Sequence, residues 1–284
     1  MSLCVAWRYE DVFCLASDTC VSVGQRTMPF GCIKVLAVPV KVVGPINFHS
    51  READIVYERT MGFAYVGGFL GSFLLKEIVA DILSHLQTLD PDSVSMEKIS
   101  AFVFRFYEHF VEQMESELGS GDMDFFFGGW CPTAHSIKMY KFHMDFVTQK
   151  PTYREVLNKS PFSFDAIGGG EPLFRKHMSE DLQKGDRKVH FDVARNIKRV
   201  IEDESVPSVG GTIQFGDFQD DGEFVLVGVQ DPIFENGEVV PKSYVRGTDL
   251  DVIRSAEDLS DLSVTYSFKA PFQDEMLKQI DSSK

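Results

Sequence analysis

The chain has 284 residues and a mass of 32.0 kDa, which suits one large domain or two small ones. Its 44% apolar and 25% charged residues are typical of globular proteins and exclude a chain that is disordered throughout. A net charge of −15 repels phosphate backbones and anionic membranes, so we expect no nucleic acid and no membrane as partner.

The first half of the chain contains short apolar runs followed by two amphipathic stretches. Residues 3–9, 12–16, 33–43 and 60–66 are rich in Val, Ile, Leu and aromatic residues, which predicts strands joined by turns. Apolar residues then recur at three- and four-residue steps from Leu75 to Leu86, which predicts a helix to about Leu89. The same spacing predicts a second, Phe-rich helix over about residues 96–118, closed by residues 119–121.

The second half repeats this alternation. Apolar runs predict strands at residues 125–130, 137–142, 162–167, 212–215 and 223–229, and helical spacing predicts helices at 171–183 and 190–203. Strand runs that alternate with helix pairs favour an α+β protein with stacked sheets and outer helices. We predict a main domain over residues 2–230 and a C-terminal appendage over 231–284 that packs on it, with a strand near 263–268 and a short terminal helix.

The ends and the cysteines indicate a cytoplasmic protein. Residues 1–4 lack the basic start and apolar run of a signal peptide, and no run approaches the roughly 20 apolar residues of a membrane span. Five cysteines without a Cys-x-x-Cys pair fit reduced thiols, and Cys4 is at most a pocket-lining residue. The histidines show no ligand spacing, and Gly168-Gly169-Gly170 lacks the Lys of a phosphate loop. We therefore predict no metal and no cofactor.

Three residues at equal spacing indicate where chemistry takes place. Ser2 becomes the first residue once Met1 is removed, and it then carries a hydroxyl nucleophile and an α-amino base together. Asp18 follows 16 residues later, and Lys34 follows after another 16. A cation such as Lys34 lowers the pKa values of such a pair, and a carboxylate such as Asp18 holds the cation. Each residue alone has an ordinary structural explanation, but the combination favours a catalytic site.

This arrangement resembles the N-terminal-nucleophile hydrolases of the proteasome β-subunit type, including the bacterial ring peptidases and the Anbu group. Ala16-Ser17-Asp18-Thr19 is similar to the family's Asp turn, and Ile33-Lys34-Val35 to its Lys strand, with Gly24 as a turn glycine between them. The order of strands and helices over residues 2–230 also matches. The resemblance implies a four-layer αββα sandwich, and it implies an oxyanion donor at Gly67, in the turn Val66-Gly67-Gly68-Phe69.

The family also places an acidic group and a hydroxyl before a Gly-Gly strand start. In this chain the corresponding loop is 202–211, and it offers Asp203 or Glu204 as the acid and Ser208 as the hydroxyl. This loop is longer than is usual in the family. In the turn before the third helix the family usually has a Ser, where this chain has Gly168-Gly169-Gly170.

The resemblance implies that the protein hydrolyses peptides or other amides. Ser2 attacks the carbonyl, its own amine takes the proton, and Lys34, Asp18 and Gly67 support the charges. It also implies a homo-oligomer, either a ring or an open spiral, whereas an ATPase partner is neither implied nor excluded. Two alternatives stay open: a small-molecule amidase on the same fold, and a non-catalytic structural subunit that keeps Met1.

Overall fold

The computed structural model describes residues 2–23, 26–28, 31–47, 49–50, 52–118, 123–145, 147–148, 150–158, 160–184, 189–235, 238–254 and 266–272. Three sequence predictions lie outside these residues: the turn glycine Gly24, the helix-closing turn 119–121 and the short terminal helix. The predicted strand near 263–268 lies partly outside them.

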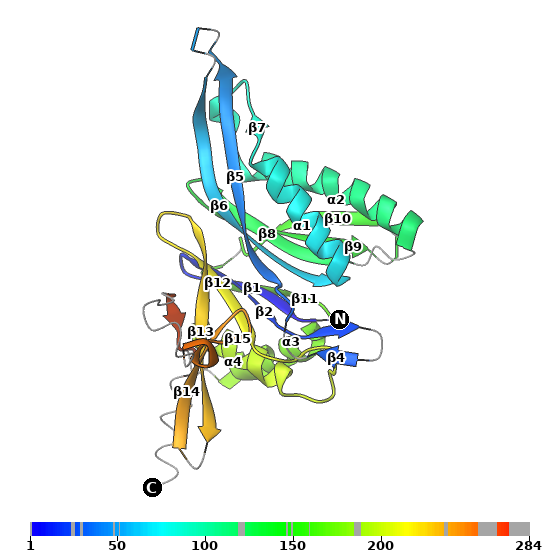
Figure 1. The fold of residues 1–284 in the computed structure, drawn as a ribbon, viewed down its shortest axis with the longest axis vertical. Helices are drawn as coiled ribbons and strands as arrows, with labels where there is room; N and C mark the ends of the chain where they lie inside the picture. Colours follow the sequence, from blue (N-terminus) through cyan, green and yellow to red (C-terminus); the bar gives the residue numbers. More distant parts are fainter. Residues whose placement is uncertain are drawn as a thin grey trace.

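One large sheet contains the N-terminal strands and the C-terminal strands side by side (Figure 1). Its strands in spatial order are β11 (Phe162–Ile167), β1 (Cys4–Tyr9), β2 (Val12–Asp18), β12 (Ile213–Phe218), β13 (Phe224–Glu235), β14 (Glu238–Val245) and β15 (Thr248–Asp249). The short strand β16 (Phe268–Lys269) pairs with β13 in parallel, whereas the other neighbours are antiparallel. The first strand of the chain therefore lies inside this sheet, between β11 and β2.

A second sheet is formed by the middle of the chain. Its strands in spatial order are β10 (Lys150–Val156), β9 (Ser136–Asp145), β8 (Met123–Cys131), β6 (Ala53–Gly67), β5 (Val35–Ile46) and β7 (Leu86–Gln87). Strands β5 and β6 form a long hairpin that projects from the body of the molecule (Figure 1). A small separate ribbon pairs β3 (Val21–Val23) with β4 (Arg26–Met28).

Two helix pairs cover the sheets. Helices α1 (Phe69–Leu83) and α2 (Met96–Leu118) contact the second sheet, with the short helix η1 (Pro91–Ser93) between them. Helices α3 (Glu171–Lys184) and α4 (Val189–Ile201) contact the first sheet, and the five-residue α5 (Leu250–Arg254) contacts β14. The helix pairs lie on opposite sides of the molecule in Figure 1. These contacts confirm a mixed α/β architecture with two sheets.

The apolar core has three parts, and alternation along β1 shows how they are arranged. Leu3, Val5 and Trp7 belong to the cluster between the first sheet and helices α3 and α4. Cys4 and Ala6 belong to a cluster that combines residues of both sheets. A third cluster joins the second sheet to α1 and α2. Successive strand residues point to opposite faces, and both faces of β1 are buried from Cys4 to Trp7, which explains the apolar run over these residues.

Several element boundaries differ from the sequence prediction. The first helix begins at Phe69 and ends at Leu83, and the Ser84 hydroxyl shares its proton between the carbonyl oxygens of Ala80 (3.0 Å) and Asp81 (2.7 Å) in the last turn. Leu86, predicted on the helix, lies in β7 and pairs with Val42. The sequence prediction missed strands β10 and β14. Both contain a proline, and β10 also has a polar sequence because it is largely exposed. The proposed division at residue 230 lies within β13.

Within the described ranges, no helix is long and apolar enough to cross a membrane.

Candidate active site

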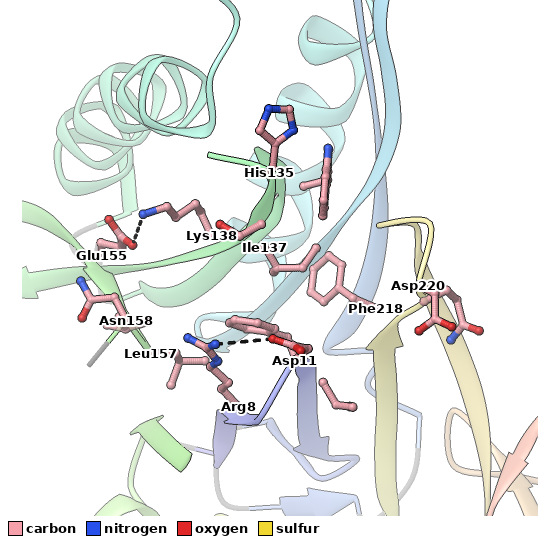
Figure 2. Close-up of a pocket in the computed structure, with 16 residues that line it drawn as sticks. Arg8, Asp11, His135, Ile137, Lys138, Glu155, Leu157, Asn158, Phe218 and Asp220 are labelled. Atoms are coloured by element: carbon pink, nitrogen blue, oxygen red, sulfur yellow. Dashed lines mark hydrogen bonds and ion pairs between the residues drawn. The ribbon is translucent and has the colours of Figure 1, made fainter. Parts of the chain in front are cut away.

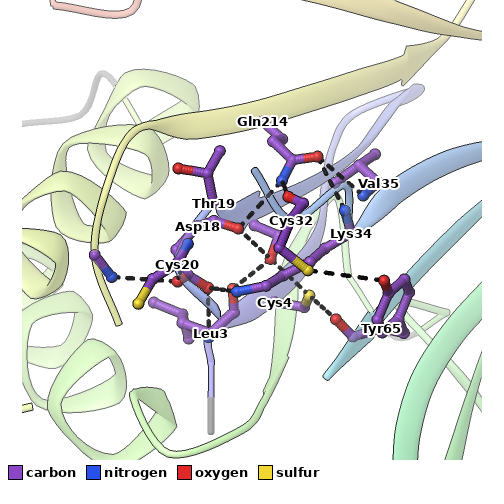
Figure 3. Close-up of polar contacts among 12 residues, drawn as sticks. Leu3, Cys4, Asp18, Thr19, Cys20, Cys32, Lys34, Val35, Tyr65 and Gln214 are labelled. Carbon is purple, nitrogen blue, oxygen red and sulfur yellow. Dashed lines mark hydrogen bonds and ion pairs between the residues drawn. The ribbon is translucent and has the colours of Figure 1, made fainter. Parts of the chain in front are cut away.

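Asp18 is the centre of a buried polar cluster at the end of β2 (Figure 3). Its side chain is fully buried, and four donors surround its carboxylate. Oδ1 accepts from Leu3 N (3.0 Å) and Lys34 Nζ (2.8 Å), and Oδ2 accepts from Cys20 N (3.1 Å) and Gly210 N (3.2 Å). A buried carboxylate is stable only when it is paired and hydrogen-bonded in this way.

Lys34 is the residue directly before β5, and its side chain reaches Asp18. The ammonium of Lys34 and the carboxylate of Asp18 form an ion pair of 2.8 Å, and the two side chains are 3% and 0% exposed. The two sheets meet through this pair, because Asp18 belongs to the first sheet and Lys34 leads into the second. Burial strengthens the attraction between the two charges relative to a surface pair.

Ser2 lies directly beside this pair. Leu3, the next residue, donates its N–H to Asp18 and accepts from Asp18 N (3.3 Å) through its carbonyl. The Ser2 carbonyl accepts from Gly170 N (3.3 Å), and Ser2 is only 6% exposed. The backbone around Ser2 is therefore held on both sides.

Gly168 allows the chain to approach Ser2 closely. It has a φ of +99°, and a Cβ built on it would lie 2.1 Å from the Ser2 carbonyl oxygen. The same position would lie 3.1 Å from Val66 Cγ1, so the turn at Gly67 is close to the Ser2 backbone. Gly67 ends β6 with a φ of +113° and precedes α1, whose N-cap residue Gly68 provides no side-chain acceptor. Peptide N–H groups at such a helix start lack intrahelical partners.

Gln214 organises the polar groups behind the ion pair. Its Oε1 accepts from Lys34 N (3.0 Å) and Val35 N (3.4 Å), and its Nε2 donates to the carbonyl oxygens of Asp18 and Cys32. The side chain is 2% exposed. An amide with both ends bonded in this way fixes the start of β5 relative to the end of β2, and so fixes Lys34 relative to Asp18.

The cysteines near the site are protonated thiols. Cys4 Sγ contacts Ser17 Oγ (3.0 Å) and the Tyr65 carbonyl oxygen (2.9 Å), and burial raises the pKa of its thiol to about 12. Burial also raises the pKa values of Cys20 and Cys32. Because the thiolate is the reactive form, these residues do not compete with a serine nucleophile.

The loop after α4 reaches the site through its backbone. Gly210 N donates to Asp18, and Thr212 N donates to Thr19 Oγ1 (2.9 Å). Asp203 instead accepts from Ser205 N (2.8 Å) within its own turn, and the hydrogen bonds to Ser205 lower the pKa of its carboxyl.

Ser2, Asp18, Lys34 and Gly67 thus lie at one end of the two sheets. In the described part of the chain, no hydrogen bond or ion pair joins Asp203, Glu204 or Ser208 to Asp18 or Lys34, and their participation stays a prediction. Sequence reasoning missed Gly168, Gly210 and Gln214. A polar Gln within the apolar run 212–215 was the signal for Gln214.

Comparison with known proteins finds similarity in structure alone. No protein-family model and no curated protein sequence matches the chain. The solved structure of an Anbu Gly-1 mutant from Hyphomicrobium sp. strain MC1 aligns over 99% of this chain and 97% of its own, with a TM-score of 0.54 and 14% identity. The structure of the helical assembly of the Anbu complex from Pseudomonas aeruginosa aligns over 93% and 98%, with a TM-score of 0.50 and 14% identity. Anbu from Yersinia bercovieri aligns over 78% and 82%, with a TM-score of 0.49 and 14% identity. The similarity to the first two structures spans nearly the whole chain, which therefore has an Anbu-like fold.

Proposed function

We propose that this protein is an N-terminal-nucleophile amide hydrolase that uses Ser2 after removal of Met1. The observation that carries the proposal is the buried Asp18–Lys34 pair, because two hydrogen bonds connect Asp18 to Leu3, the residue next to Ser2. Burying two charges is costly, so a pair placed directly beside a candidate nucleophile is typical of a site in which charges assist a reaction.

In the proposed reaction, Ser2 Oγ attacks the carbonyl carbon of an amide, and the free α-amine of Ser2 accepts the hydroxyl proton. The positive charge of Lys34 stabilises the negative charge that develops on Ser2 Oγ as it loses its proton, and Asp18 orients Lys34. The Gly67 N–H donates to the oxyanion of the tetrahedral intermediate. The C–N bond then breaks, the amine leaves with the proton, and water hydrolyses the resulting ester on Ser2. Asp203, Glu204 and Ser208 are candidates for the second acid and hydroxyl.

We further infer that the two sheets and two helix pairs form a four-layer αββα sandwich over residues 2–230. The arrangement of the three apolar clusters supports this reading, because each cluster lies between one pair of neighbouring layers. Residues beyond 230 extend β13 and add β14 to the same sheet, which supports an appendage that packs on the main domain.

We also propose that the protein assembles with copies of itself, as a ring or an open spiral. Its structural neighbour from Pseudomonas aeruginosa is described as a helical assembly. In this chain, Leu70, Leu74 and Ile78 are 58%, 40% and 41% exposed on α1. Residues four apart share one helix face, so these side chains form an apolar stripe, and such stripes commonly mark contacts between proteins.

Hydrolysis of a panel of fluorogenic peptides and small amides by the full chain tests the proposal. We expect activity with a free Ser2 N-terminus by intact mass, loss of activity in Ser2→Ala, and partial activity in Ser2→Thr. Preference for small amides over peptides favours the amidase alternative. A free Ser2 without hydrolysis of any amide contradicts the catalytic role, and an intact Met1 without hydrolysis favours the structural subunit. Full activity in Ser2→Ala shows that Ser2 is not the nucleophile.

A further inference from the structure

A cavity of about 370 Å³ lies between the two sheets, at the opposite end of β1 from Ser2 (Figure 2). The β1–β2 hairpin forms one wall, the start of β9 and the end of β8 form another, and the ends of β10 and β12 complete it. This volume lies within the range of small-molecule sites, which are about 300–1,000 Å³. None of the residues proposed for catalysis lines the cavity.

Arg8 supplies a cation to this cavity. Its Nε donates to the Glu10 carbonyl oxygen (2.5 Å), and its guanidinium carbon lies 5.1 Å from the centre of the Phe13 ring. Its terminal nitrogen Nη2 also forms a long ion pair of 3.7 Å with the carboxylate of Asp11, whose side chain is fully exposed to solvent (Figure 2). Among the described residues, no hydrogen bond occupies the two terminal nitrogens of Arg8. These nitrogens are planar, paired donors that fit a carboxylate.

The remaining charges at the cavity disfavour a ligand with two negative charges. Lys138 and Glu155 neutralise one another through an ion pair of 2.7 Å, and this hydrogen bond raises the pKa of Lys138. Asp11 and Asp220 are exposed at the rim and negative. They repel a phosphate dianion more strongly than a carboxylate, which carries half its charge.

Apolar side chains provide the rest of the lining. Ile137 and Phe218 point into the cavity from the two sheets (Figure 2). Trp130 lines it as well, and its backbone carbonyl accepts from Tyr57 OH (2.6 Å). The turn at Gly222 packs against Trp130, because a Cβ built at Gly222 would lie 2.9 Å from Trp130 Cβ. These contacts hold the aromatic wall in place.

The backbone around the cavity is strained. His135 (φ +49°) and Leu157 (φ +65°) line it, and Glu10 (φ +53°) lies in the hairpin turn between Arg8 and Asp11. Positive φ angles are uncommon for residues other than glycine and cluster at ligand-binding positions. Leu157 is the clearest case, since it is 6% exposed and lacks the short polar side chain that favours this conformation.

We propose that this cavity binds a small organic carboxylate with a compact apolar body. The carboxylate accepts hydrogen bonds from the terminal nitrogens of Arg8, and the apolar body packs between Ile137, Phe218 and Trp130. The ligand carries one carboxylate, and a linker of two carbons joins this carboxylate to an aromatic ring about as large as that of an aromatic amino acid. This inference stands independently of the proposed hydrolysis, because the two sites share no residue.

Titration of the full chain with 3-phenylpropionate, followed by ligand-observed NMR and by tryptophan emission, tests the proposal. Trp7 is fully buried, so a saturable change in emission reports on Trp130. The neutral isostere 3-phenylpropanamide lacks the charge, and we expect it to bind about ten-fold more weakly or worse. In Arg8→Gln we expect the affinity for 3-phenylpropionate to fall by the same factor. Arg105 is an exposed residue on α2 outside the cavity, and Arg105→Gln should leave this affinity unchanged.

Equal affinity for the carboxylate and the amide overturns the assignment of Arg8. Absence of saturation by either compound up to about 10 mM overturns the site itself, because a built pocket of this size binds such ligands at millimolar concentration or below. If Arg8→Gln does not fold, the comparison of the two compounds on the unaltered chain still decides between these outcomes.

Discussion

Replacing Lys34 by Met removes the ammonium from Asp18 while it keeps a side chain of similar length. The Asp18 carboxylate then stays buried with three of its four donors, the N–H groups of Leu3, Cys20 and Gly210. Breaking a buried ion pair on one side typically costs about 3–5 kcal/mol of folding free energy. Because three backbone donors continue to stabilise the carboxylate, we expect a cost at the lower end, about 3 kcal/mol.

Asp18→Asn tests the same pair from the other side. The amide keeps one oxygen, so two of the four donors lose their acceptor and each costs about 1–3 kcal/mol. The double variant has neither the ammonium nor the carboxylate, so it buries no unpaired charge. We therefore expect the double variant to be less destabilised than the sum of the single variants, with a coupling of about 2 kcal/mol.

Urea unfolding followed by far-UV circular dichroism, at one fixed protein concentration, measures these free energies. Lys76→Met is the matched control, since Lys76 pairs at the same distance of 2.8 Å with Glu77, whose side chain is 51% exposed to solvent, and it should cost about 0–1 kcal/mol. Additivity of the two buried substitutions within about 0.5 kcal/mol would refute the reasoning that the pair acts as one unit.

Three further predictions concern other parts of the structure. Gly168→Ala should destabilise the protein by more than the roughly 1 kcal/mol that a positive φ alone costs, because its Cβ collides with the Ser2 carbonyl. Gly31→Ala, with a φ of +107° and no neighbour within 4 Å, is the control, and equal losses in urea unfolding contradict the collision. Burial raises the pKa of Asp165, but Lys141, Arg154, the Ala166 N–H and Arg175 outweigh it and hold that pKa below its ordinary value. The unfolded chain then binds the proton more tightly, so the stabilisation is complete above the ordinary Asp pKa and is lost as pH falls through the lowered one. Asp165→Asn should flatten the acid limb of stability against pH, and an unchanged limb argues against this network as its source. Leu70→Glu should weaken self-association in sedimentation velocity, whereas Val147→Glu, at a position that is 93% exposed, should not, and equal effects exclude the α1 stripe as the contact.

The strands and helices of the core could be predicted because their sequences carry the periodicity of burial. Helix α4 begins and ends within two residues of its prediction, since one face packs on β1 and β2. Strand β10 was missed for the opposite reason, because most of its side chains face solvent. The end of α1 was missed because Leu86 is apolar in both helix and strand settings, and only Ser84 and the pairing with β5 decide between them.

The candidate site was predictable where one residue type has few alternatives. A Lys inside an apolar run requires a partner, and Asp18 is that partner. Backbone donors leave no such mark, so the contribution of Gly210 N to Asp18 followed only from the structure. The cavity at Arg8 was not visible in the sequence, because its lining comes from four separate segments of the chain.

The pairing of β1 with β2 restricts how the number of residues between Ser2 and Asp18 can change. The hairpin turns at Glu10 and Asp11, with Tyr9 opposite Val12 and Cys4 opposite Ser17. A single residue added to either strand would exchange its two faces beyond that point, so that the side chains now in the helix-side cluster would enter the cluster between the sheets. Either Leu3 would lose its hydrogen bond to Asp18 or Asp18 would turn away from Lys34. Length changes in these two strands are therefore compatible with the site only in steps of two residues, or where a β-bulge absorbs the extra one.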